Sequence, residues 1–128
     1  MIVLDTHVLL WWTLDPAKLS RKASGLCSEI TKTGCLISSI SIWELGIKIK
    51  KGALDIGMTI DEFTRKIRTL NSVEIVPVDE NIWIKSLQLD WDHRDPADRV
   101  IVATAESREA SIVSMDEKIR SFYRDTIW

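Results

Sequence analysis

Short apolar runs alternate with longer amphipathic segments along the whole chain. The runs have the length and the β-branched content of buried strands, and turn-forming residues mark their ends, such as Gly34 before one run and Pro77 late in another. Strands are therefore predicted over residues 2–4, 35–38, 73–78 and 111–114, with 126–128 as a candidate edge strand.

The segments between these runs have the spacing of amphipathic helices. Ile60, Phe63, Ile67 and Leu70 recur at the intervals that place them on one helix face. Asp79 is a typical N-cap for the helix that follows it. Helices are therefore predicted over residues 6–14, 20–31, 41–51 and 59–70, after Asp79, and over 95–109 and 117–122.

This order of elements predicts the fold class. Strands that alternate with helices predict βα units, and strands that are apolar on both faces predict a sheet covered on both sides. We expect an α/β fold with a mostly parallel central sheet of four or five strands. The 128 residues suffice for one hydrophobic core and are too few for two, so residues 1–128 are predicted to form a single domain.

Composition and charge add a few constraints. Apolar residues make up 45% and charged residues 28% of the chain, which is typical of a soluble globular protein. The net charge of -2 gives no sign of a nucleic-acid partner, although bound divalent cations would invert the charge of an acidic site. Cys27 and Cys35 have no metal-ligand or redox spacing, so free buried thiols in a reducing cytosol are expected. Asp5 and His7 interrupt the apolar N-terminal run, and no basic leader precedes it, so neither export nor a membrane span is expected.

Acidic residues stand where predicted strands give way to helices. Asp5 ends the first strand and Asp116 comes shortly after the strand 111–114. If these strands are neighbours, the two carboxylates share the edge of the sheet at which functional groups of α/β proteins gather. Each aspartate could instead cap the helix that follows it, and both interpretations stay open here.

Further acids lie near the start of other predicted helices. Glu44 follows Ser41 at the spacing of a capping box, in which the acid reaches back to the first turn. Asp95 is a typical N-cap ahead of Pro96, and Asp98 is favourably placed for the helix dipole. We assign Asp95 to capping and Asp98 to a functional site.

Four of these acids, Asp5, Glu44, Asp98 and Asp116, can point into one cleft. Hard cations require such oxygen clusters, and Mg²⁺ takes one or two protein carboxylates directly while it keeps several waters. A metal bound there lowers the pKa of an attacking water and offsets the charge that develops on a phosphodiester. The pattern therefore favours metal-dependent hydrolysis without a covalent intermediate.

Four segments, in order along the full chain, carry a family resemblance: residues 3–11 (VLDTHVLLW), 41–45 (SIWEL), 93–99 (HRDPADR) and 114–116 (SMD). Together they resemble the motifs of PIN-domain ribonucleases, and in particular those of the VapC-like toxin branch, in its subgroup with a DTH start and an H-x-DP-x-DR segment. Ser114 stands where a threonine is more typical of this family.

The resemblance implies an α/β/α sandwich in which the metal-binding acids are Asp5, Glu44, Asp98 and Asp116. Thr6 is then the small hydroxyl residue beside the first acid. The resemblance also implies Mg²⁺- or Mn²⁺-dependent endonucleolytic cleavage of RNA that leaves a 5′-phosphate and a 3′-hydroxyl. Its toxin members dimerise, and a small antitoxin blocks their active site.

Other polar residues have less specific interpretations. His7 and His93 could suggest histidine acid-base catalysis, which requires a close pair with suitable pKa values. We interpret His7 instead as a packed residue or a partner of Asp5, and His93 as a residue that orders the loop before Asp95. Arg99 either contacts a phosphate or forms an ion pair with a nearby acid.

Tryptophans suggest a docking surface. Trp11, Trp12 and Trp43 lie on two predicted helices, and the adjacent Trp11 and Trp12 cannot both face the core. Most of the tryptophans are expected in the core, but one of these two can line a groove for a partner segment. Trp11, Trp12 and Trp43 are the candidates for that groove, with an antitoxin helix as its occupant.

Two other functional interpretations stay open. One is a PIN nuclease that processes RNA or cleaves DNA outside a toxin-antitoxin pair. The other is a non-catalytic protein-binding module, in which the acids are helix caps and the tryptophans dock a partner. Nucleotide binding and serine hydrolysis are disfavoured, because the chain has no dinucleotide-binding, phosphate-loop or nucleophile-elbow motif.

Overall fold

The computed structural model describes residues 1–128 and contains one five-stranded sheet with the order β3-β2-β1-β4-β5. The strands are β1 (Ile2–Leu4), β2 (Cys35–Ser38), β3 (Val73–Val76), β4 (Ser111–Val113) and β5 (Thr126–Ile127). Every neighbouring pair is parallel, so the prediction of a mostly parallel sheet is confirmed for all strands.

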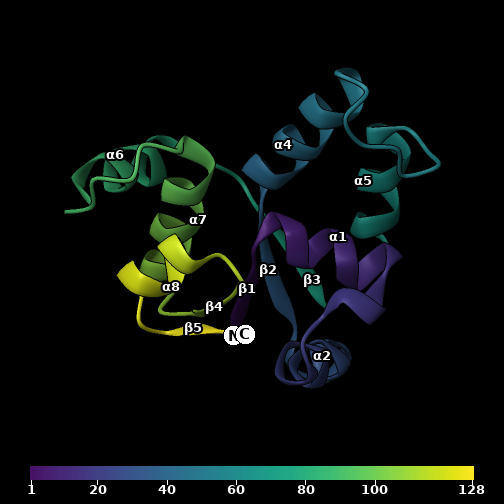
Figure 1. Ribbon diagram of the computed structural model, residues 1–128, viewed down its shortest axis with the longest axis horizontal. Helices are drawn as coiled ribbons and strands as arrows, with labels where there is room; N and C mark the ends of the chain where they lie inside the picture. Colours follow the sequence, from purple (N-terminus) through teal and green to yellow (C-terminus); the bar gives the residue numbers. More distant parts are fainter.

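Helices connect the strands and cover both faces of the sheet (Figure 1). They are α1 (Thr6–Leu14), the 3₁₀ helix η1 (Pro16–Lys18), α2 (Arg21–Ser28), α3 (Ile30–Thr33), α4 (Ser39–Lys50), α5 (Ile60–Arg68), α6 (Glu80–Gln88), α7 (Pro96–Ser107) and α8 (Glu117–Phe122). None of these helices has both the length and the apolar character needed to cross a lipid bilayer.

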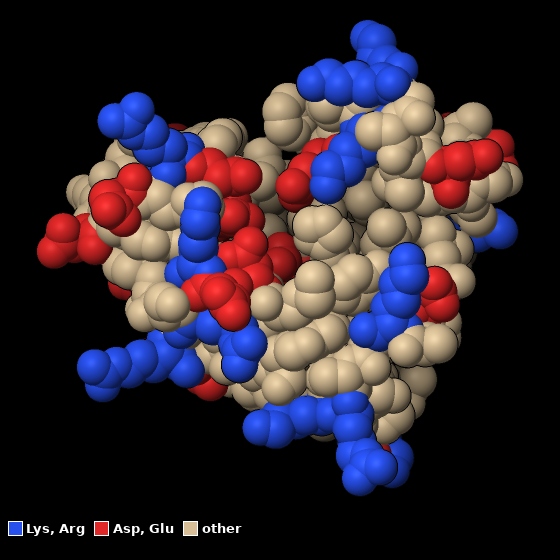
Figure 2. Space-filling view, in the orientation of Figure 1, with Lys and Arg blue, Asp and Glu red and all other residues tan.

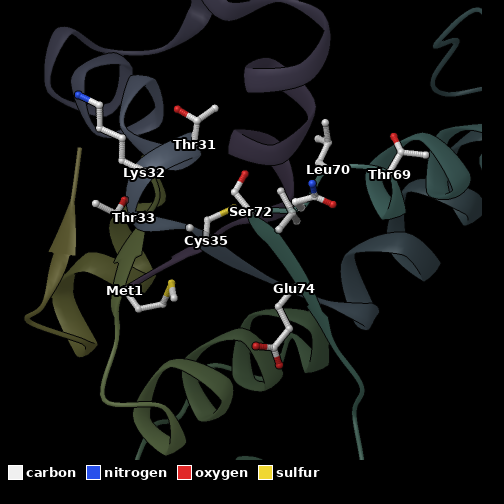
Figure 3. Close-up of a pocket in the computed structure, with 12 residues that line it drawn as sticks. Met1, Thr31, Lys32, Thr33, Cys35, Thr69, Leu70, Ser72 and Glu74 are labelled. Carbon is white, nitrogen blue, oxygen red and sulfur yellow. The ribbon is translucent and has the colours of Figure 1, made fainter.

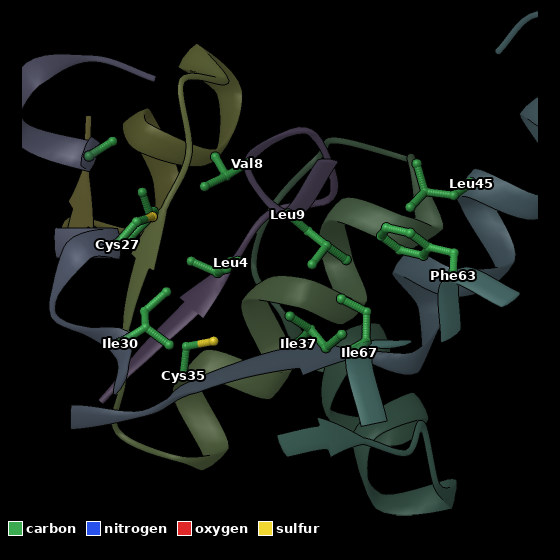
Figure 4. Packing of buried hydrophobic residues seen from close by; sticks show 12 residues of the cluster. Leu4, Val8, Leu9, Cys27, Ile30, Cys35, Ile37, Leu45, Phe63 and Ile67 are labelled. Carbon is green, nitrogen blue, oxygen red and sulfur yellow. The ribbon is translucent and has the colours of Figure 1, made fainter. Parts of the chain in front are cut away.

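Alternating strand residues build two hydrophobic layers. Leu4 and Ile37 pack on one face of the sheet with residues of α1, α2, α4 and α5 (Figure 4). Val3 and Leu36 pack on the other face with residues of α7 and α8. Successive side chains of a strand point to opposite faces, so strands that are apolar throughout require both layers of helices. The predicted α/β/α sandwich is confirmed.

Among the boundaries that differ from the prediction, two have a local chemical reason. The predicted helix 20–31 is split into α2 and α3, and the Ser28 hydroxyl donates to the Gly25 carbonyl at 2.7 Å, which competes with the helical hydrogen bonds. Strand β3 ends at Val76 instead of Val78, since Pro77 has no N–H with which to continue the ladder.

The turn from α3 into β2 depends on Gly34. Its φ of 75° lies in the left-handed region, and a Cβ there would come within 3.2 Å of the Ser72 carbonyl oxygen. A glycine is therefore required for β2 to enter the sheet beside β3.

Both cysteines are free and buried, as predicted. Burial raises the pKa of the Cys27 thiol to about 11 and that of Cys35 to about 12. Thiols with such pKa values stay protonated near neutral pH and contribute packing rather than reactivity.

The parallel strands bring four helix N-termini to one edge of the sheet. Helices α1 and α4 begin directly after β1 and β2, and α8 follows soon after β4 (Figure 1). Helix α7 begins at Pro96 beside this edge and packs against α4. Helix N-termini carry partial positive charge, so this edge is favourable for acidic side chains and anions.

Candidate active site

Acidic side chains gather at the carboxyl ends of the strands. Figure 2 shows Asp and Glu side chains along a hollow in the middle of the molecule, between the part that contains α7 and α8 and the part that contains α1 and α4. Asp5, Glu44, Asp98 and Asp116 come to this edge from α1, α4, α7 and α8.

Asp5 is the most buried of these acids, with 5% of its surface exposed. Its Oδ1 accepts a hydrogen bond from the Thr6 backbone N–H at 2.8 Å, and its Oδ2 accepts one from the Ser114 hydroxyl at 2.6 Å. Burial raises the pKa of Asp5 above its usual value, although the two hydrogen bonds lower it in part. Asp5 does cap α1, but it also faces a neighbouring strand end across the sheet.

Glu44 is held by Thr6 and does not form the capping box that its sequence suggested. The Thr6 hydroxyl donates to Glu44 Oε1 at 2.6 Å, and its oxygen lies 2.8 Å from the Ser41 hydroxyl, which must therefore be the donor. The capping-box interpretation is wrong because α4 begins two positions earlier, with Ser38 as its N-cap. Its first turn therefore ends before Glu44, whose side chain points across to α1.

Asp98 lies in the first turn of α7 and is paired with His93. His93 Nε2 and Asp98 Oδ2 are 2.7 Å apart, and 16% of the Asp98 side chain is exposed. The pKa of Asp98 is raised to about 6, mainly by burial and in smaller part by the charges of nearby acids, among them Asp5 and Asp116, while the His93 hydrogen bond lowers it. Asp98 therefore shares an electrostatic environment with the acids that end β1 and begin α8.

Asp116 and Asp95 both cap helices. Asp116 Oδ1 accepts from the backbone N–H groups of Lys118 and Ile119 at the start of α8. Asp95 Oδ1 accepts from those of Ala97 and Asp98, as predicted for the N-cap of α7. For Asp116 the capping interpretation is confirmed, and a site role stays compatible with it, since only one of its carboxylate oxygens is used.

The donor set fits a divalent cation. One carboxylate oxygen accepts no hydrogen bond in each of Glu44 (Oε2), Asp98 (Oδ1) and Asp116 (Oδ2). No lysine or arginine forms an ion pair with any of the four acids. Carboxylates without a lysine or arginine partner are costly to bury, and hard cations bind such oxygens. The one group of three residues whose ligand atoms lie within 4.8 Å of one another is His93, Asp95 and Asp98, and in it one Asp95 oxygen already caps α7. Asp5, Glu44 and Asp116 are not part of that group.

Arg99 has a different role from either of those expected. Its guanidinium donates to the backbone carbonyls of Ser86, Leu89, Trp91 and His93 at 2.5 to 3.0 Å. It forms no ion pair with an acid, and four of its five N–H groups are engaged, so it is poorly suited to hold a phosphate. Arg99 instead fixes the loop that presents His93 to Asp98.

The three tryptophans grouped as a partner groove are dispersed. Trp12 packs against the hydrophobic layer on the α1 side of the sheet. Trp11 lies beside His7 and Trp128 and lines a pocket with residues of η1. Trp43 lines a different pocket, between α4, α6 and the start of α7. A single groove lined by all three is therefore not formed, because the two helices turn these side chains in different directions.

The largest pocket, of about 690 Å³, lies away from the acids. It opens at the amino ends of β2 and β3. Its walls are formed by Met1, residues 31–35 and residues 69–74 (Figure 3). Its one acid, Glu74, is paired with Arg108 at 2.6 Å. The largest pocket therefore lies at the amino edge of the sheet, whereas the acids lie at the carboxyl edge. We take the edge with the carboxylates as the candidate active site.

Ser114, Ser41 and His93 belong to the site more closely than their sequence positions suggested. Each contacts one of the acids or a residue that holds one, and each lies inside one of the four family-like segments. The sequence does not distinguish a serine or histidine that holds an acid from one that caps a helix or orders a loop, so only the three-dimensional contact assigns its role. The threonine usual at position 114 was the one available clue, because it preserves the hydroxyl.

Known proteins resemble this chain in sequence and in fold. The family profile of the PIN domain matches residues 2–125. Ribonuclease VapC22 of Mycobacterium tuberculosis is 25% identical over 99% of this chain and 98% of its own length. A toxin-antitoxin complex from Klebsiella pneumoniae superposes with a TM-score of 0.66 at 19% identity, covering 100% of this chain and 97% of that chain. VapC20 of Mycobacterium tuberculosis, a toxin that cleaves the sarcin-ricin loop, superposes with a TM-score of 0.67 at 16% identity over 94% of each chain.

Proposed function

This chain belongs to the PIN-domain family, and on that premise we propose that it is a metal-dependent endoribonuclease and the toxin of a toxin-antitoxin pair. The observation that carries the proposal is the convergence of Asp5, Glu44, Asp98 and Asp116 at one sheet edge without a lysine or arginine partner. The same four acids are those that the family motifs designate.

These carboxylates are the residues that would hold Mg²⁺ or Mn²⁺. Such an ion, when bound, lowers the pKa of a water molecule and offsets the charge that develops on the phosphodiester. The free oxygens of Glu44, Asp98 and Asp116 are available as ligands, directly or through water. The PIN-domain match supports this metal chemistry. Cleavage assays with Mg²⁺ and with Mn²⁺ distinguish the two metals.

Hydroxyl and imidazole groups hold these acids in place. Ser114 restrains Asp5, Thr6 restrains Glu44, and His93 restrains Asp98. Such restraint fixes the carboxylates before a substrate arrives, so little reorganisation is needed during the reaction. In the hydrolysis that we propose, water adds to phosphorus and the bond from phosphorus to the 3′-oxygen breaks, which leaves a 5′-phosphate and a 3′-hydroxyl.

The assignment to a toxin pair rests on relatives. The name of VapC22 is that of a ribonuclease, and one structural neighbour is a toxin-antitoxin complex. We infer that an antitoxin protein binds this chain and blocks the acidic site, that the chain forms a homodimer, and that it acts in the cytoplasm.

The test is cleavage of a structured RNA pool by the purified, antitoxin-free protein, with Mg²⁺, with Mn²⁺ and with EDTA. Cleavage should require a divalent metal, and Asp5→Asn or Asp98→Asn should reduce it at least about a hundredfold, because each removes a negatively charged ligand oxygen. Asp116→Asn should also lose activity, although asparagine can still cap α8.

The matched control is Asp79→Asn. Asp79 caps α6, where its Oδ1 accepts from the Ile82 N–H at 3.0 Å, but it is not one of the four acids. This variant should cleave RNA like the wild type. Equal activity in the Asp116→Asn and wild-type proteins, or cleavage that persists in EDTA, would reduce the acids to helix caps and favour a protein-binding module.

A further inference from the structure

An apolar pocket of about 420 Å³ lies next to the acidic site and is used by nothing described so far. It is lined by Ser39, Ile40, Trp43, Val78, Trp83 and Pro96. These residues come from the start of α4, the segment after β3, helix α6 and the first position of α7. The pocket therefore lies where α4 and α7 approach each other at the carboxyl edge of the sheet.

The walls of this pocket are continuous with the site. Trp43 is the neighbour of Glu44 on α4, and Pro96 lies in the same helical turn as Asp98 on α7. Adjacent helix residues diverge, so Glu44 points to Thr6 in the acidic cleft while Trp43 borders the pocket. Both walls of the pocket that border the site therefore belong to helices that also carry one of the acids.

The pocket is lined by two exposed indole rings, those of Trp43 and Trp83. Trp43 and Trp83 are 59% and 43% exposed, although tryptophan is ordinarily among the more buried residues. They come from different helices and border the same space. Planar apolar walls of this kind bind flat aromatic rings by stacking, irrespective of sequence.

One polar group in the pocket lacks an acceptor. The Ser39 hydroxyl accepts a hydrogen bond from the Val78 N–H at 3.1 Å and donates to no group in the structure. Binding pockets for small planar ligands typically combine apolar walls with a few such oriented groups. Every nucleobase offers an oxygen or a ring nitrogen that could accept this hydrogen bond.

We propose that this pocket, the Trp43–Trp83 pocket, binds an unpaired nucleobase next to the scissile phosphate of the RNA substrate. The proposal rests on the function proposed above and adds to it a base-binding pocket formed by Trp43, Trp83 and Ser39. Continuity with the acids and the unused Ser39 donor favour a base over an apolar side chain of a protein, which would leave that donor without a partner.

Nucleotide binding can be tested without catalysis. The indole N–H signals of the six tryptophans are observed by NMR in ¹⁵N-labelled protein, with Trp43→Phe and Trp83→Phe used for assignment. In EDTA, each of the four nucleoside 5′-monophosphates should shift the Trp43 and Trp83 signals, while ribose 5-phosphate should not. Shifts that are absent, or equal for ribose 5-phosphate, would overturn the proposal.

The second test measures the steady-state kinetics of RNA cleavage by tryptophan variants. Trp43→Ala and Trp83→Ala should each raise KM for RNA about tenfold, with kcat and Mn²⁺ affinity little changed, and Trp43→Phe should retain most of the affinity since a ring remains. Leu87→Ala is the control, because Leu87 is 79% exposed on α6 but lies outside the pocket. It should behave like the wild type.

The outcomes separate the alternatives. If Trp83→Ala and Leu87→Ala both change the sedimenting mass or antitoxin binding while KM stays constant, the surface is a protein interface and the base pocket is rejected. If the wild type cleaves no RNA, the proposed function fails, while the nucleotide titration still decides whether the pocket binds bases.

Discussion

Asp98 carries a charge that the surrounding protein stabilises poorly. Its pKa of about 6 has burial as the main cause, and neighbouring acids add to the effect. An acid whose pKa is higher in the folded than in the unfolded protein binds its proton more tightly in the folded state. Stability from this group is therefore largest at low pH and declines as pH rises from about 4 through about 6.

This sign gives a prediction for the metal-free protein. Between pH 5 and pH 7.5 its free energy of unfolding should fall as pH rises, and Asp98→Asn should increase that free energy at pH 7.5 by about 1 to 3 kcal/mol. The measurement is urea unfolding in EDTA across this pH range. A flat profile in the wild type, or an Asp98→Asn variant less stable than the wild type, would contradict the electrostatic account.

Glu74, whose pKa is lowered, does not contribute to the pH dependence of the unfolding free energy in this range. Glu74 has its pKa lowered by the hydrogen bond from Arg108, so its contribution is lost only as pH falls below the usual glutamate range. Above pH 5 the contribution of Glu74 to the unfolding free energy therefore does not change with pH. Excess Mn²⁺ should reverse the slope, because the metal competes with the proton for Asp98 and stabilises the protein more as pH rises.

Ser114 gives a second prediction at the scale of one residue. It is fully buried, donates to Asp5 Oδ2 and accepts from the Asp116 N–H at 3.0 Å. Ser114→Ala should lower the unfolding free energy by about 1 to 3 kcal/mol and weaken Mn²⁺ binding in calorimetry, since both partners lose a buried hydrogen bond. Ser114→Thr keeps the hydroxyl and should retain metal affinity; equal weakening in both variants would show that the hydroxyl is not the cause.

At the scale of elements, one arginine organises the loop from Leu89 to Asp95. Four carbonyls of this region and the end of α6 accept from Arg99, and Trp91 of the same loop stacks on Phe122 of α8 with ring centres 4.6 Å apart. The loop has no regular structure of its own. Its position, and with it the orientation of His93 toward Asp98, therefore depends on these contacts.

Replacing Arg99 with lysine tests this dependence. Lysine keeps the charge but cannot reach four carbonyls in a plane, so Arg99→Lys should lower the unfolding free energy by about 2 to 4 kcal/mol and speed hydrogen exchange in the loop. Arg108→Lys is the matched control: its ion pair with Glu74 is exposed, and the loss should be at most about 1 kcal/mol. Similar losses in both variants would argue against the proposed role of Arg99.

Helix starts show where sequence reasoning worked and where it did not. The starts of α1, α7 and α8 were predicted from Asp5, Asp95 and Asp116, because a cap and its helix are local features. The start of α4 was misplaced, since Ser38, Ser39 and Ser41 all have the chemistry of a cap. Only the tertiary contact of Ser41 with Thr6 distinguishes the residue that caps from the residue that serves the site.

At the scale of the whole molecule, apolar strands separated by helices were enough to predict a mostly parallel sheet covered on both faces, and the family resemblance implied the α/β/α sandwich. The resemblance to PIN domains is confirmed by the profile match over residues 2–125. The distribution of the tryptophans could not be predicted, because helix periodicity gives the face of a helix but not the neighbour that covers it. Trp12 therefore packs against the core, whereas Trp43 lines a pocket, a difference that periodicity alone does not give.

The most direct test of the central claim, that four carboxylates form one metal site, is the location of Mn²⁺ by anomalous X-ray scattering from crystals grown with Mn²⁺. We expect a peak at the carboxyl edge of the sheet, at a coordination distance of about 2.0 to 2.3 Å from Asp5 or Asp98 and near Glu44 and Asp116. A saturated crystal with Mn²⁺ bound only at His93 and Asp95, or with no peak among the four acids, would contradict it.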